Sequence, residues 1–251
     1  MRRILLTIEY DGTRYAGWQR QENALAVQQV VEEKLRALTK EPIILHGASR
    51  TDAGVHALGQ AAHFDTACSI PADKFSFALN TMLPPDIRIR ASRQVPPAFH
   101  ARFSTKGKRY RYLFHVSRHA GALNRLTHAH VIYPLDVPRM AEEARALVGT
   151  HDFAAFAASG SVVRDTVRTI YRADVSQADT EVRLIVEGNG FLYNMVRIIA
   201  GTLVGVGSGK LEPGAFARAI ASGNRLDLGV TAPAHGLTLM EVFYDHADLE
   251  C

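Results

Sequence analysis

The hydrophobic pattern of the first 95 residues changes period several times, and this alternation restricts the folds that the chain can adopt. Some segments alternate apolar and polar side chains, which is typical of half-buried strands, and others repeat apolar residues at helical spacing. The predicted strands are 3–10, 42–45, 58–65 and 87–95, and the predicted helices are 25–39 and 71–83. The predicted order of elements is therefore β-α-β-β-α-β.

The rest of the chain contains a similar mixture of elements. The predicted strands are 108–116, 168–176, 182–187 and 237–244, and the predicted helices are 137–148, 191–206 and 213–221. A chain of 251 residues is long enough to bury two small cores. We therefore expect an α+β protein with two ferredoxin-like or RRM-like halves, residues 1–104 and 105–251, built on mostly antiparallel sheets.

The positive charge of the chain is concentrated in one central block. The net charge is only +4, but residues 87–135 contain ten Lys or Arg and no Asp or Glu, which leaves 19 basic and 25 acidic residues elsewhere. A basic block of this kind favours a polyanionic partner such as a nucleic acid. The alternative is a solvated basic strand and loop with no partner.

Several classes of protein are disfavoured by motifs that the sequence lacks. It has no apolar run of about 18 residues and no signal-peptide pattern, so we expect no membrane association. Its two cysteines, Cys68 and Cys251, have no zinc-site spacing, which favours a reducing cytoplasm. There is no phosphate-binding loop, dinucleotide fingerprint or metal-ligand spacing, so we expect neither cofactor nor metal.

The segment from Gly47 to Ala57 contains the densest group of reactive side chains. It joins two predicted strands, and Arg50 lies two residues before Asp52. A nearby guanidinium keeps a carboxylate ionised, and an ionised carboxylate suits nucleophilic or general-base catalysis. The alternative is a turn aspartate that bonds to its own backbone.

The predicted strand 108–116 combines aromatic and cationic side chains. Tyr110 lies on the face opposite Arg109 and Arg111, and we expect Tyr112 and Phe114 to be core residues. Aromatic rings stack on bases and cations contact phosphates. Tyr110 is therefore the candidate for stacking on a base.

Two further residues, Arg197 and Trp18, each have two possible interpretations. Arg197 is the only charged residue between Glu187 and Lys210, so its charge needs either a buried partner, for which we choose Asp52, or a path to the surface. Trp18 lies in a polar, glycine-containing loop and either contacts RNA or fills the core.

Four segments of the sequence, in this order, resemble the tRNA pseudouridine synthase A (TruA) family. They are IEYDGTRYAGWQRQ, SRTDAGVHALGQAAHF, FHARFSTKGKRYRY and FLYNMVRIIAG, and the resemblance extends from residue 4 to about residue 244. It implies the pseudouridine synthase fold, with two halves joined around a basic cleft, and a homodimer. It also implies isomerisation of uridine to pseudouridine at positions 38, 39 and 40 of the tRNA anticodon arm, without a cofactor.

The resemblance assigns roles to individual residues. Asp52 matches the catalytic nucleophile, Tyr110 the ring that stacks on the target base, and Arg197 the partner of the aspartate. Arg50 matches an arginine linked to RNA binding and base flipping, and no role attaches to Leu192, Tyr193 or Asn194. The expected RNA-binding residues are Arg20, Arg50, Arg102, Arg109, Tyr110 and Arg111.

Two points stay open at this stage. The attack of Asp52 on either the sugar C1′ or the base is compatible with the sequence. A non-catalytic RNA-binding protein with RRM-like halves is the alternative function, although no good RNP1 motif is present. A metal-dependent phosphodiesterase would need ligand clusters that the sequence lacks.

Overall fold

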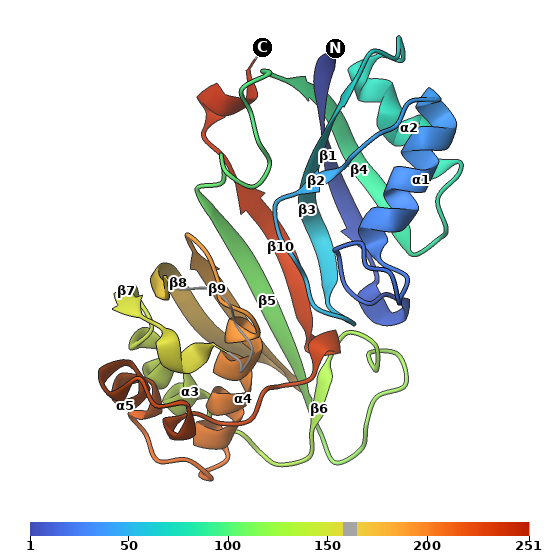
Figure 1. The fold of residues 1–251 in the computed structure, drawn as a ribbon. Helices are drawn as coiled ribbons and strands as arrows, with labels where there is room; N and C mark the ends of the chain where they lie inside the picture. The colour runs from blue at the N-terminus through green and yellow to red at the C-terminus, as the bar shows by residue number, and fades with distance from the viewer. Residues whose placement is uncertain (158–164, 251) are drawn as a thin grey trace. The chain divides into compact units, whose positions relative to one another are not determined.

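The computed structural model of the chain describes residues 1–157 and 165–250 (Figure 1). The chain divides into two compact units. The first contains Met1–Lys108 together with the segment from Leu239 onward, and the second contains Arg109–Thr238. The expected halves met near residue 105; in the structure the last strand packs with the first unit. Cys68 is a free cysteine, and Cys251 lies outside the described residues.

The first unit is a sheet with two helices, in the chain order that the sequence predicts. Strand β1 is central and pairs antiparallel with β3 and β4, while β2 and β10 pair with β3. The strands are β1 (Arg2–Tyr10), β2 (His46–Gly47), β3 (His56–Thr66), β4 (Ile87–Val95) and β10 (Leu237–Phe243), and the helices are α1 (Val27–Thr39) and α2 (Phe75–Asn80). Helices α1 and α2 lie on the same side of this sheet (Figure 1).

Periodic burial explains why these segments form their elements. In β1, the alternating residues Ile4, Leu6 and Ile8 are fully buried. In α1, Val27, Val31 and Leu35 form a buried stripe with a spacing of four residues. Burying these stripes against the sheet gives the helix its stability, since a 13-residue helix is marginal in isolation.

One predicted strand of the first unit is wrong. Residues 42–45 are not a strand, and the pairing with β3 occurs instead at β2, where His46 faces His63. The physical reason is a local competitor: the Leu45 N–H donates to the buried carboxylate of Glu32 at 3.0 Å. An N–H held in this way has no hydrogen left for a neighbouring strand.

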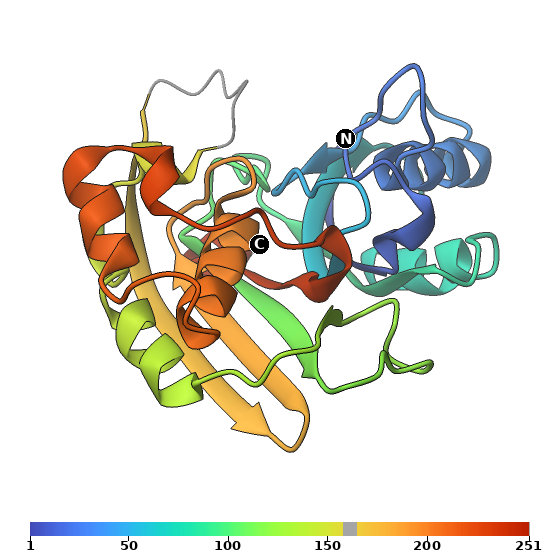
Figure 2. The same ribbon diagram turned by 90° about the horizontal axis from the view of Figure 1, so that it is seen from below.

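The second unit is a sheet with three helices on one face (Figures 1 and 2). The strand order is β5-β9-β8-β7, and β6 pairs parallel with β5. The strands are β5 (Gly107–Val116), β6 (Ala129–Val131), β7 (Gly149–Asp152), β8 (Val167–Ala178) and β9 (Glu181–Gly188), and the helices are α3 (Val137–Arg145), α4 (Met195–Gly207) and α5 (Ala215–Ser222). The short strands β6 and β7 were not predicted.

Helix α4 begins four residues later than the sequence predicts. Asn194, the residue before its first turn, has a left-handed backbone with φ of 61°, so residues 191–194 are not helical. Asparagine tolerates this conformation better than most residues do. Short 3-10 turns complete the described elements: η1 (Gly12–Arg14), η2 (Ala72–Lys74), η3 (Ala154–Phe156), η4 (Arg225–Asp227), η5 (Ala234–Gly236) and η6 (His246–Leu249).

The α+β class predicted from the sequence is confirmed, since both units combine a sheet with helices. The helices of the described residues are all too short or too polar to span a bilayer.

Candidate active site

The segment that carries Asp52 is a rigid loop between β2 and β3. The Val55 N–H donates to the Asp52 carbonyl at 3.1 Å, and Gly54 has a φ of +77°, which is the backbone that a type II turn requires at its third position. Upstream, the side-chain amide of the fully buried Gln60 bonds to both the N–H and the carbonyl of Ser49. The backbone on both sides of Asp52 is therefore fixed.

A second loop, residues 11–18, supports the Asp52 loop from the side. The Trp18 N–H donates to the Thr51 carbonyl at 3.1 Å, and the Gly54 N–H donates to the Tyr15 carbonyl at 3.3 Å. A Cβ on Gly17 would lie less than 3.0 Å from the Thr51 carbonyl oxygen, and one on Gly12 would overlap the Val55 carbonyl oxygen in the same way. Glycine is thus required for the two loops to approach each other.

Trp18 fills the core of this support. Its side chain is 2% exposed, stacks near Tyr10 and lies directly against Gly47, where a Cβ would overlap the indole nitrogen. The Tyr10 hydroxyl bonds to the Thr51 hydroxyl at 2.7 Å in the same buried region. Of the two readings of Trp18, the structure supports the core residue.

The other candidates of the first unit lie at its surface. Asp52 is half-buried, and Arg50 is exposed and makes no side-chain ion pair with any residue in the described ranges. Arg20 is exposed and pairs with Glu32 at 3.3 Å. Arg50 is therefore available to an anionic ligand, whereas Arg20 could bind one only by breaking its ion pair with Glu32.

Two histidines near the loop have structural roles. His56 Nδ1 accepts the Gly12 N–H at 3.0 Å, and His63 Nδ1 accepts the Ala101 N–H at 3.1 Å. The His63 nitrogen that accepts this N–H carries no proton of its own. Burial lowers the pKa of His63 to about 3, so this side chain is uncharged at neutral pH.

In the second unit, Tyr110 lies in a well-packed part of β5. Its ring is buried and meets Phe191 edge to face, with centroids 5.1 Å apart. Tyr112 is fully buried, with its hydroxyl donating to the Pro233 carbonyl at 2.7 Å, and Phe114 is also buried. Tyr112 and Phe114 are therefore core residues, as the sequence indicates.

Arg197 is oriented by two neutral oxygen acceptors in the first turn of α4. Its Nε donates to the Ala232 carbonyl and its Nη1 to the Asn194 side-chain oxygen, both at 2.8 Å. The guanidinium is half-buried. These two acceptors fix the direction of the guanidinium.

The structure therefore adds Asn194 and Phe191, to which the sequence analysis gave no role. Asn194 holds Arg197, and Phe191 packs on Tyr110. The sequence signal was an asparagine three residues before the only charge of an apolar segment, because a side chain at the residue before a helix reaches the third residue of its first turn.

The remaining cations of the basic block differ in their surroundings. Arg109 pairs with Glu187 at 2.8 Å. Burial lowers the pKa of Arg111, whose Nε is buried and has no hydrogen-bond acceptor among the described residues. Arg102 is exposed, with its guanidinium 5.8 Å from the centre of the Phe103 ring.

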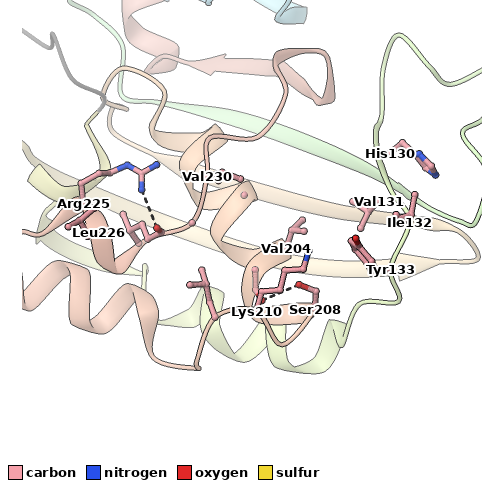
Figure 3. A pocket seen from close by; sticks show the side chains of 15 residues that line it. His130, Val131, Ile132, Tyr133, Val204, Ser208, Lys210, Arg225, Leu226 and Val230 are labelled. Carbon is pink, nitrogen blue, oxygen red and sulfur yellow. Dashed lines mark hydrogen bonds between the residues drawn. The ribbon is translucent and has the colours of Figure 1, made fainter.

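The second unit also contains an apolar cavity of about 1010 Å³, shown in Figure 3. Its wall includes Ile132, Tyr133, Val204, Leu226 and Val230, and none of the predicted site residues. Within the described ranges, no three His, Cys, Asp or Glu side chains gather as a metal site would need.

The chain matches known proteins over almost its whole length. A family model described as "tRNA pseudouridine synthase" matches residues 6–104 and 144–245. A protein named tRNA pseudouridine synthase A from Ruminiclostridium cellulolyticum is 53% identical over 245 residues, which cover 97% of this chain and 100% of that protein. Its namesake from Acetivibrio thermocellus is 51% identical over 244 residues, with the same coverage.

Among solved structures, an archaeal box H/ACA sRNP Nop10–Cbf5 complex aligns with 80% of this chain and 44% of the matched one, at 10% identity and a TM-score of 0.36. The assignment rests on the family model and on the relatives of similar sequence. They confirm the resemblance that the sequence indicates: the chain belongs to the tRNA pseudouridine synthase family.

Proposed function

We propose that the protein converts uridine to pseudouridine at positions 38, 39 and 40 of the tRNA anticodon arm, with Asp52 as the nucleophile. Membership of the family makes the protein a uridine isomerase. The observation that supports Asp52 is the rigid loop around it, which two backbone contacts from residues 15 and 18 hold in place. Such fixation is what a nucleophile needs, because misplacement by about 1 Å costs about 100-fold in rate.

The proposed reaction leaves the composition of the nucleotide unchanged, although the hydrogen on C5 is exchanged for one on N1. The target uridine leaves its stack, and the Asp52 carboxylate attacks either the sugar or the base as the bond between N1 and C1′ breaks. The detached uracil rotates and C5 bonds to C1′, while the bond to the Asp52 carboxylate breaks. The hydrogen of C5 then leaves as a proton and N1 takes up a proton, so the product is an isomer of uridine. Because the reaction is an isomerisation, we propose that no cofactor takes part.

Two residues of the second unit complete the proposed site. Tyr110 stacks on the target base and retains it during rotation, which its fixed contact with Phe191 supports. Arg197 pairs with Asp52 and keeps it ionised, which the two neutral acceptors that orient its guanidinium support. In this proposal the first unit supplies the nucleophile and the second supplies the stacking ring and the cation.

The RNA backbone is proposed to contact the basic residues that the sequence singles out. Arg50 and Arg102 are the strongest of these candidates because both are exposed. Arg109 and Arg20 each hold a carboxylate, so binding a phosphate would replace an existing ion pair. Arg111 is half-buried and its Nε is closed to solvent, so a phosphate would have to approach its other guanidinium nitrogens.

We also propose that the protein acts in the cytoplasm as a homodimer. The support for self-association is the apolar cavity of the second unit, where Leu226 is 87% exposed and Val230 79% exposed. Contiguous exposed apolar side chains mark association surfaces. Sedimentation equilibrium tests this, because Leu226→Glu should convert a dimer to a monomer, and a wild-type monomer would refute the proposal.

Release of tritium from tRNA labelled at uridine C5 tests the function directly. The wild-type protein should release tritium from unmodified anticodon-arm RNA, and Asp52→Asn should bind the RNA without release. Full release by Asp52→Asn would refute the mechanism. Binding without any release by the wild-type protein would instead support a non-catalytic RNA-binding protein.

A further inference from the structure

One exposed aromatic ring of the first unit stands on a turn that is unusually well fixed. Phe103 is 76% exposed, at the tip of the turn formed by residues 100–104. The Ser104 N–H donates to the His100 carbonyl at 2.9 Å, and the N–H groups of Arg102 and Phe103 both point to His100 Nδ1, at 3.1 and 3.4 Å. The turn therefore does not depend on the Phe103 side chain for its shape.

The same turn is anchored to the core from below. The Ala101 N–H donates to His63 Nδ1 at 3.1 Å, and the Tyr244 hydroxyl donates to the Ala101 carbonyl at 2.6 Å. Ala101 is fully buried, in a cluster with Ala48 and Phe99. An anchored turn presents its exposed side chain in one position, so little conformational entropy is lost when a ligand binds there.

Phe103 is the outermost member of a series of aromatic rings. Its ring lies 4.3 Å from the His100 ring at an angle of 32°, and His100 lies 4.6 Å from the buried His63. Burial lowers the pKa of both histidines, so the rings behind Phe103 are uncharged at neutral pH. One face of Phe103 is thus supported by a neutral ring.

A cation lies beside this ring. The exposed guanidinium of Arg102 is 5.8 Å from the centre of the Phe103 ring. Proteins that bind single-stranded nucleic acid combine these parts, an aromatic ring for the base and a cation for the phosphate. Isolated exposed apolar side chains are common on protein surfaces and need no function. Phe103 differs from such isolated side chains because it has a supporting ring, an anchored turn and an adjacent cation.

Phe77 provides a comparison within the same unit. It is 68% exposed on α2 and also has a cation near its ring, with Lys74 Nζ at 5.3 Å. In the described part of the chain, however, no aromatic ring supports Phe77 from behind. Phe77 therefore matches Phe103 in exposure and in its neighbouring charge but lacks the support.

We propose that Phe103, supported by His100 and flanked by Arg102, is a stacking site for an unpaired base of the RNA substrate. This site is separate from the one that receives the reacting uridine. The Asp52 turn lies at the start of β3 and His63 lies seven residues along the strand from His56. At about 3.3 Å per residue these two points of β3 lie about 23 Å apart, a length of several nucleotides of RNA. The inference rests on the proposed function only in taking RNA as the ligand.

Equilibrium binding of an unmodified anticodon stem-loop RNA tests the stacking site. Phe103→Leu keeps an apolar side chain and removes the aromatic face, so the Kd should rise by about 5- to 150-fold, the range that loss of one stacked base produces. Phe77→Leu is the matched control and should leave the Kd within twofold. A Phe103→Leu protein with the Kd of the control would overturn the proposal.

The salt dependence of binding separates stacking from phosphate contacts. Phe103→Leu should weaken binding at every salt concentration without changing the slope of log K against log salt, whereas Arg102→Gln should reduce that slope by about 0.7. If Phe103→Leu reduced the slope as much as Arg102→Gln does, this result would count against stacking. Unfolding curves of the two phenylalanine variants should coincide, because neither side chain is buried.

A fluorescent variant gives a readout that a purely structural residue would not move. Trp18 is the only tryptophan of the chain and is buried, so Phe103→Trp adds one exposed indole. Its fluorescence should be quenched by the RNA, while that of Trp18 in the wild-type protein should not. An unquenched indole in the RNA complex would also overturn the proposal.

Activity measurements keep the stacking site and the proposed function apart. At saturating RNA, Phe103→Leu should release tritium with the wild-type kcat, because the ring does not touch the reacting uridine. Normal catalysis with an unchanged Kd would remove only the stacking site. The opposite outcome is also possible. If Phe103→Leu weakened RNA binding but the wild-type protein released no tritium, the stacking site would stand and the proposed function would be refuted.

Discussion

Replacement of Gly17 by alanine tests whether the support loop positions the Asp52 loop. Gly17 has a φ of +89°, so an alanine there costs about 1–2 kcal/mol in backbone strain alone. Its Cβ would also overlap the Thr51 carbonyl oxygen, which is backbone and is held by the Trp18 N–H at 3.1 Å. Relieving such overpacking costs about 1–3 kcal/mol more. Gly17→Ala should therefore lose about 2–5 kcal/mol of unfolding free energy.

Gly209 is the matched control for this substitution. Its φ is +72°, but a Cβ there would meet no atom within 4 Å, so Gly209→Ala should show only the backbone strain. The two variants should therefore differ by the cost of the overlap. Urea unfolding followed by circular dichroism measures each loss of stability.

Gly17→Ala should also slow catalysis in the protein that remains folded. The atom displaced by Gly17→Ala belongs to the residue before Asp52, so a shift of about 1 Å would lower kcat by about 100-fold. Gly209→Ala should keep the wild-type kcat. Tritium release under single-turnover conditions gives these rates. A Gly17→Ala protein as stable and as active as Gly209→Ala would refute the idea that the support loop fixes the nucleophile.

Three further predictions follow from contacts in the two units. Thr51→Val removes a hydroxyl bonded to a buried tyrosine at 2.7 Å and should cost about 1–2 kcal/mol in urea unfolding, whereas Ser49→Ala should be nearly neutral because no group of the described residues pairs with its buried Oγ. Asn194→Ala removes one acceptor of Arg197 and should lower kcat about tenfold while KM changes by less than threefold; equal changes in both would contradict a positioning role. Acidification should destabilise the wild-type protein: the pKa of His63 is about 3 when folded and about 6.5 when unfolded, so the unfolded state binds more protons between these values and stability falls as the pH falls through this window. His63 alone contributes less than about 1.4 kcal/mol per pH unit to this slope, so the slope should be smaller in His63→Gln, as urea unfolding at pH 4, 5 and 7 would measure.

Local periodicity was sufficient to predict the strands that bury a regular stripe. Residues 3–10 and 87–95 are examples, and they form β1 and β4 within one residue of the expected bounds. The shortest strands could not be predicted in this way. Strand β7 has only four residues, none of them buried, so its conformation depends on pairing with β8 rather than on its own pattern.

In the candidate site, too, the sequence predicts features that depend on neighbouring residues but not those that depend on residues far along the chain. The sequence of residues 47–57 indicates a reactive loop around Asp52, because glycines, a carboxylate and a cation occur together. It gives no sign that Gly12 and Gly17 must lack side chains for this loop to be supported, since that requirement comes from atoms of Val55 and Thr51, which are 43 and 34 residues further along the chain. The role of Trp18 was open for the same reason.

The return of the chain to the first unit after Thr238 has a consequence for biosynthesis. The Phe243 carbonyl accepts the Lys106 N–H at 2.8 Å, and Tyr244 packs against Phe99. When the ribosome has made residue 108, the first unit still lacks these partners, and 130 residues of the second unit must be translated before they exist. At about 5–20 residues per second the wait is on the order of ten seconds. During this time the nascent first unit exposes the edge of β3, so a stop codon near residue 238 would release a chain with an unpaired strand that is prone to aggregate.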